Sequence, residues 1–139
     1  MKIQQINVTT GVGDLKFTMS EQDIIQLLGK PTTIDNDTLN KCLVYYYDEL
    51  NLAVVFVEIE GQMIIDSFEM ENVCYQLWDK PIVKQNFNAI IDLFKQNNIS
   101  DFEQHKNEYG SYIMYKNLFI EFDKENNIAT DFSLSNPTL

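Results

Sequence analysis

The chain has 139 residues, 45% hydrophobic and 12% aromatic, which suffices for one domain with a real core and argues against global disorder. Its 21 acidic residues stand against ten lysines and no arginine, so the net charge is −11. This charge repels phosphate backbones and argues against direct nucleic-acid binding, whereas it attracts basic proteins.

The N-terminal segment and the two cysteines indicate the cellular compartment of the protein. Residues 1–10 hold no apolar run long enough for a signal peptide, and no stretch approaches the ~20 apolar residues of a membrane span. Cys42 and Cys74 lack CxxC spacing and are expected to be reduced, half-buried residues. We therefore expect a cytoplasmic protein without membrane contact.

The first elements are short strands and a helix. Residues 3–9 alternate apolar and polar side chains, as an edge strand would, and residues 15–18 are predicted to be extended after a turn. Ser20 followed by Glu21, Gln22 and Asp23 predicts a helix start, because its hydroxyl can accept from free amides. Gly29, followed by Pro31, predicts the helix end.

Three strands are predicted next, at 43–48, 52–60 and 62–70, because these segments are rich in Val, Ile, Tyr and Phe. The connections between them are short, which predicts antiparallel hairpins. The polar segment 32–41 is predicted to be a loop, and residues 71–80 a linker.

The same order of elements follows in the second half. Residues 82–97 have helical apolar spacing, residues 99–103 are expected to be extended, and strands are predicted at 111–115, 118–123 and 128–134. Residues 104–108 form a polar segment.

The two halves match in the order of their elements and in several residues. Asn51, Leu52 and Phe56 correspond to Asn117, Leu118 and Phe122, and residues 67–70 correspond to 131–134. The sequence therefore predicts a single α+β domain, residues 1–139, built from two related units at about 15–71 and 82–134. Each unit would contain one helix and three antiparallel strands, their sheets would join or pack together, and the helices would cover one face.

The segment between Lys41 and Lys80 is the most informative for function. Its 38 residues, 42–79, contain no positive charge, eight acidic residues and seven aromatic residues. Such a surface suits the capture of a basic partner, because charge speeds encounter and aromatic side chains anchor an interface. The alternative reading is an ordinary solvated sheet with acids outward and aromatics inward.

The candidate partner-binding residues all come from this segment. Consecutive residues Tyr45, Tyr46 and Tyr47 cannot all point inward, so at least one tyrosine should be exposed. Tyr46 and Trp78 are the preferred aromatic anchors. The full candidate set is Tyr46, Asp48, Glu49, Glu58, Glu60, Asp66, Glu69, Glu71 and Trp78.

No motif of catalysis, cofactor binding or metal binding stands out. His105 is the single histidine and has no organised partner in the sequence, so it is expected to be a surface residue. Residues 35–37 and 123–127 gather oxygen donors but lack the glycine and terminal glutamate of a calcium loop. We therefore expect no enzyme, no cofactor and no metal site.

The segment from Ser20 to Pro31 is predicted to form a helix that ends in Leu28-Gly29-Lys30-Pro31 and precedes three antiparallel strands. It resembles the helix-then-meander unit of small lipoprotein and β-lactamase-inhibitor-like folds, in which tandem copies can join. In size, acidity and lack of a catalytic motif, the chain is similar to the immunity proteins of bacterial polymorphic-toxin and contact-dependent growth inhibition systems.

This resemblance implies an immunity protein that binds a cognate toxin, basic and possibly a nuclease, in the cytoplasm and occludes its active site. Two alternatives stay open. An acidic secretion chaperone would be a dimer with an apolar groove, and a small-ligand-binding domain would need a concave pocket with converging polar groups.

Overall fold

The computed structural model describes residues 2–139 and contains two helices and two sheets. The predicted mixed α and β class is confirmed in this form, with strands predominating. The large sheet has eight antiparallel strands. Its strands, from one edge to the other, are β10 (Glu103–Asn107), β11 (Gly110–Tyr115), β12 (Leu118–Phe122), β13 (Ala129–Ser135), β7 (Gln62–Met70), β6 (Leu52–Ile59), β5 (Cys42–Tyr47) and β4 (Thr33–Asp37).

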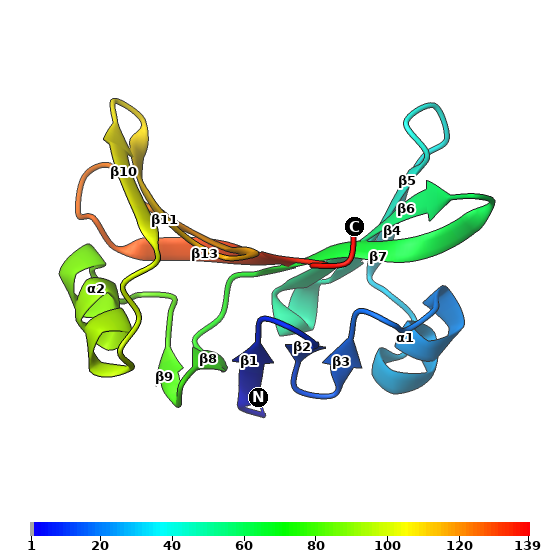
Figure 1. The fold of residues 1–139 in the computed structure, drawn as a ribbon. Helices are drawn as coiled ribbons and strands as arrows, with labels where there is room; N and C mark the ends of the chain where they lie inside the picture. Colours follow the sequence, from blue (N-terminus) through cyan, green and yellow to red (C-terminus); the bar gives the residue numbers. More distant parts are fainter. Residues whose placement is uncertain (1) are drawn as a thin grey trace.

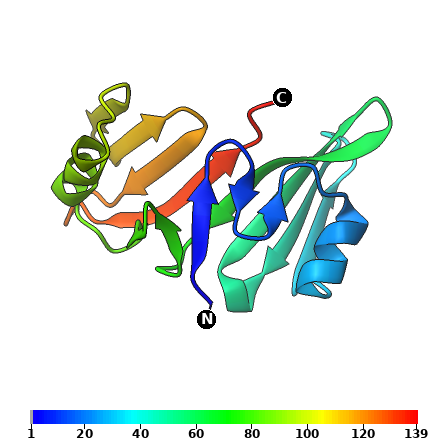
Figure 2. The ribbon, with the colours of Figure 1, turned by 60° about the horizontal axis from the view of Figure 1, so that its bottom comes forward.

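A second layer covers one face of the large sheet. It consists of α1 (Glu21–Leu28), α2 (Phe87–Gln96) and a small five-stranded sheet that lies between them (Figures 1 and 2). The strands of the small sheet, in spatial order, are β3 (Leu15–Lys16), β2 (Gly11–Val12), β1 (Gln4–Asn7), β8 (Tyr75–Leu77) and β9 (Lys80–Pro81). Both helices therefore lie on the same side of the large sheet.

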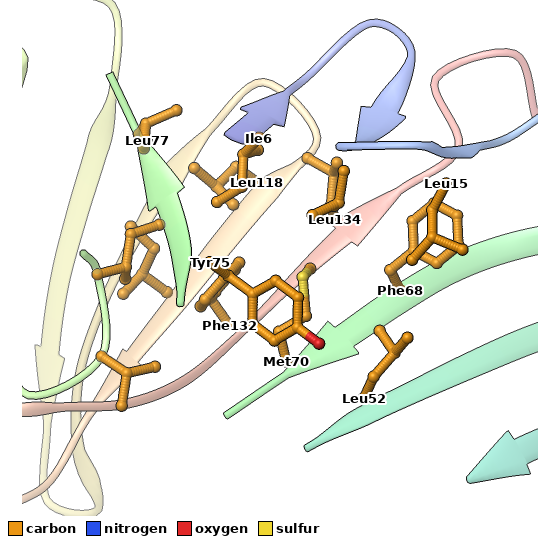
Figure 3. Packing of buried hydrophobic residues seen from close by; sticks show 14 of the residues in the cluster. Ile6, Leu15, Leu52, Phe68, Met70, Tyr75, Leu77, Leu118, Phe132 and Leu134 are labelled. Carbon is orange, nitrogen blue, oxygen red and sulfur yellow. The ribbon is translucent and has the colours of Figure 1, made fainter. Parts of the chain in front are cut away.

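The core fills the space between these two layers. Figure 3 shows Ile6, Leu15 and Leu77 of the small sheet facing side chains of β12, β13 and β7. Phe68 and Leu134 are fully buried there and are cross-strand partners in the pairing of β7 with β13. That pairing joins the two halves of the large sheet and places its central strands over the small sheet.

Local sequence signals explain both helices. Ser20 caps α1 through a reciprocal pair of hydrogen bonds with Asp23, at 3.0 and 3.1 Å, so an aspartate completes the capping box here. Gly29 ends α1 at φ 85° and ψ −168°, a conformation that glycine alone adopts readily. The second helix begins at Phe87, later than the predicted start at 82, because Asn86 caps it by accepting from the Ala89 amide at 2.8 Å.

Three segments differ from their predicted structure. The predicted loop 32–41 contains β4, and the polar residues near 105 form β10. Both strands are exposed edge strands that lack apolar alternation, and their backbone pairing with β5 and β11 holds them in place. The predicted linker 71–80 contains β8 and β9, and β8 pairs with β1 in parallel.

The two faces of β13 yield a prediction. Leu134→Ala removes a fully buried side chain between the layers and is expected to lower the free energy of unfolding by about 2–5 kcal/mol. Ser133→Ala, one residue away on the other face, should change it by less than about 0.5 kcal/mol. Urea denaturation followed by circular dichroism measures both, and equal losses would contradict the assignment of one covered face.

Candidate functional site

The face of the large sheet turned away from the helices is called the open face here. No element of residues 2–139 lies over it, and the outer hairpins at both ends bend away from the helix layer, so this face is concave (Figure 1). Directly paired residues share a face, so the register assigns every strand position to one side. The charged and aromatic side chains at open-face positions are Asp35, Asp37, Tyr46, Glu69, Glu103, His105, Tyr112, Phe119, Glu121 and Asp131.

No lysine lies at an open-face position. Of the ten lysines, Lys106 alone belongs to a strand of the large sheet. Its Nζ lies 5.1 Å from the ring centre of Phe87 in α2, on the covered side. Within residues 2–139, the single lysine–carboxylate pair within 4.0 Å joins Lys41 to Glu58, and neither side chain lies on the open face. The one basic side chain at an open-face position of the described strands is His105, whose Nε2 lies 3.6 Å from a carboxylate oxygen of Glu103. The open face is therefore predominantly negative and has no lysine.

Burial, and in addition four nearby carboxylates, raise the pKa of the Cys42 thiol. Cys42 lies on the open face in β5, and its pKa is raised first by burial and then by the charges of four carboxylates. These carboxylates are Asp37, Asp66, Asp35 and Glu69. Asp66 is the extra residue where β7 shifts register against β6, and its charge acts on this face.

Two carboxylates face each other on the half of the open face formed by β10 to β13. Glu121 of β12 and Asp131 of β13 are direct cross-strand partners, an arrangement that destabilises a sheet when both are charged. A hydrogen bond shared with Asp131, followed by burial and the charges of Asp131 and Glu69, raises the pKa of Glu121 to about 7. The pKa of Glu69 on β7 is also raised, by burial and then by Asp131. This group lacks a counter-charge.

Aromatic rings continue from these carboxylates toward the β10 edge. The rings of His105 and Tyr112 are stacked with their centres 4.6 Å apart, and those of Tyr112 and Phe119 are 5.0 Å apart. Tyr112 is also the direct partner of Glu121 across β11 and β12. The open face therefore places rings next to carboxylates.

A shallow hollow lies on the other half of the open face and holds four of the candidate residues. It has a volume of about 220 Å³, and its lining includes Tyr46, Asp48, Glu69 and Glu71. Tyr46 is 37% exposed, so the expected outward tyrosine of the three is this one, whereas Tyr45 and Tyr47 are buried. The predicted set therefore partly converges at one place.

The other candidates lie elsewhere. Glu49 is exposed in the 3-10 turn η1 (Asp48–Leu50), and Glu60 lies in the β6–β7 hairpin turn. Glu58 is on the opposite side of β6, 4.0 Å from Lys41. Trp78 is half-buried against Phe94 of α2, with ring centres 5.4 Å apart, so it packs with the core and is not an outward anchor.

The sequence prediction missed the second half of the open face. Glu121, Asp131, Tyr112 and Phe119 lie outside the lysine-free segment that directed attention to residues 42–79. The alternation of Tyr112 and Met114 with the buried Ile113 and Tyr115 could have indicated outward positions on β11.

Among residues 2–139, no three His, Cys, Asp or Glu side chains are grouped so that they could hold a metal ion. None of the helices in the described chain has both the length and the apolar character needed to cross a membrane.

Comparisons with known proteins give distant structural similarity alone. The sequence matches no protein-family model and no curated protein. An extracellular protein containing an SCP domain from Bacillus anthracis is similar over 84% of this chain and 43% of its own, with 11% identity and a TM-score of 0.49. A cysteine-rich secretory protein from Staphylococcus aureus is similar over 99% and 51%, with 9% identity and a TM-score of 0.44. The chain thus spans about half the length of these two structures.

The opposed carboxylates predict a pH-dependent stability. The folded-state pKa of Glu121, about 7, lies above its ordinary value of 4.5, so the folded state binds more protons between these values. Wild-type stability should therefore fall as the pH rises through this window. Glu121→Gln should be more stable than the wild type near pH 8, by about 1 kcal/mol or less after allowance for solvent screening.

Urea denaturation at several pH values measures this difference. The gain from Glu121→Gln should disappear below about pH 4.5, where the carboxyl is protonated in both states. Asp92→Asn, which removes one exposed carboxylate of α2, is the matched control for the change in net charge. A gain of equal size at every pH would contradict repulsion as its cause.

Proposed function

We propose that this chain is an immunity protein that binds a basic toxin domain through the open face and blocks its active site. The observation that carries the proposal is an unpartnered, concave sheet face with clustered carboxylates, exposed rings and no lysine. A partner whose active site uses Lys or Arg to bind phosphates would be complementary to this face. The cytoplasm, where such a toxin would act, is the proposed location.

Different parts of the open face would contribute differently to binding. Exposed carboxylates such as Glu103 and Asp35 would mainly raise the rate of encounter. Tyr46 and Tyr112 would supply contact area, because tyrosine combines a large ring with a polar tip and loses little entropy. Glu69 lies between them, next to Ala53 on one strand and Ser133 on the other, where a docked side chain would meet small neighbours.

We further propose that the large sheet consists of two related units, one formed by β4 to β7 and the other by β10 to β13. Each set follows one helix and forms an antiparallel meander. The register shifts at corresponding places, leaving Asp66 unpaired in β7 and Thr130 unpaired in β13. A joined pair of units provides a wider face than one unit could, which suits the occlusion of an active site.

Co-expression with a toxin domain tests the proposed function. The domain is taken from the gene adjacent to that of this chain, and bacterial growth is measured. Wild type should restore growth. The double variant Glu69→Lys/Asp131→Lys should lose protection, because reversing two central charges is expected to weaken binding at least about 100-fold.

The control carries the same change in net charge away from the open face. Asp92→Lys/Glu125→Lys alters exposed carboxylates of α2 and of the β12–β13 connection, and it should protect as well as wild type. Circular dichroism verifies that each variant is folded. Failure of the wild type to protect would refute the immunity role, and full protection by Glu69→Lys/Asp131→Lys would refute the open face as the interface.

A further inference from the structure

One row of side chains crosses four strands on the second half of the open face. His105 pairs with Tyr112, Tyr112 pairs with Glu121, and Glu121 pairs with Asp131. Direct cross-strand partners have Cβ atoms about 4.5–5.5 Å apart, so an aromatic ring and two carboxylates border the same space above the sheet. Phe119 adds a second ring beside Tyr112.

The carboxylates and the rings each indicate that this part of the open face binds a positively charged group. The carboxylate pair has no lysine on its face to neutralise it. The ring of Tyr112 lies between those of His105 and Phe119, whereas Phe119 is half-exposed and pairs on its other side with the small Ser133. The face of an aromatic ring attracts cations, so Phe119 is the ring that can receive one. Elsewhere the chain does place cations over rings, with Lys106 at 5.1 Å from Phe87 and Lys116 at 5.4 Å from Tyr115. In residues 2–139, no such cation lies over Tyr112 or Phe119.

The combination of ring and carboxylate selects the kind of cation. A guanidinium is planar, so it can stack on an aromatic ring while its N–H groups donate to carboxylate oxygens in a fork. A lysine ammonium is a strongly hydrated point charge and gains less from a ring beside a carboxylate. An arginine therefore matches this row better than a lysine does.

We propose that an arginine of the docked basic protein lies beside this row, with its guanidinium stacked on Phe119 over the small Ser133 and hydrogen-bonded to Glu121 and Asp131. This inference rests on the proposed function, because it names the side chain of the toxin that the open face would recognise. This contact would make the part of the open face on β11 to β13 selective for arginine over lysine in the partner.

Short peptides test the arginine contact without the toxin. The isotope-labelled full chain is titrated with capped tetra-arginine and tetra-lysine peptides at low salt, and amide shifts are followed by NMR. Tetra-arginine should cause saturable shifts centred on β11, β12 and β13 and should bind about five-fold or more tightly than tetra-lysine. Glu121→Gln/Asp131→Asn should weaken the binding of both peptides.

Variants of two aromatic residues separate ring stacking from charge. Phe119→Leu should remove the preference for arginine while leaving residual binding of both peptides to the acidic face. Tyr46→Leu, at an exposed tyrosine on the other half of the same face, is the matched control and should keep the preference. The amide spectrum of each variant verifies its fold.

Two results would overturn the arginine contact. One is equal affinity for the two peptides in the wild type, and the other is a preference for arginine that persists in Phe119→Leu. Neither result depends on growth protection. Loss of all protection with a retained peptide preference would refute the immunity role and leave the arginine row standing, so the two failures can be told apart.

Discussion

The packing of the helix layer and small sheet against one side of the large sheet determines the character of the other side. Because strand side chains alternate, burial of Phe68, Met70, Phe132 and Leu134 below the central strands forces their neighbours to point the opposite way. Glu69, Ser133 and Asp131 are such neighbours. The open face is thus the geometric complement of the core, and its composition can vary without altering what holds the domain together.

This separation explains how the chain tolerates an unfavourable arrangement of charge. Directly opposed Glu121 and Asp131 weaken the β12–β13 pairing, but the strands are held by Ile120 and Phe132 on the covered face, which are 1% exposed. Natural chains keep such local conflicts mainly where binding or catalysis uses them. A partner that supplies positive charge would convert the repulsion into attraction, so the stability lost in the free protein would return in the complex.

The sequence predicted the elements that have strong local signals. The α1 cap at Ser20 and the apolar strands β5 to β7 follow directly from residue type and spacing. The edge strands β4 and β10 could not be predicted in this way, because their polar side chains are exposed and pairing with a neighbour alone makes them strands. The contact between Glu121 and Asp131 depends on a register shift at Thr130, which no local pattern reveals.

The antiparallel pairing of β7 with β13 also has a consequence for how the molecule folds. It joins residues 67–70 to residues 132–135, so much of the chain must be ordered or looped out before this contact forms. Contacts so distant in sequence slow folding. Before this contact forms, one edge of β7 is unpaired, and two molecules of the protein could associate through it. Asp66 and Glu69 give that transient edge a negative charge, which disfavours its pairing with the same edge of another molecule.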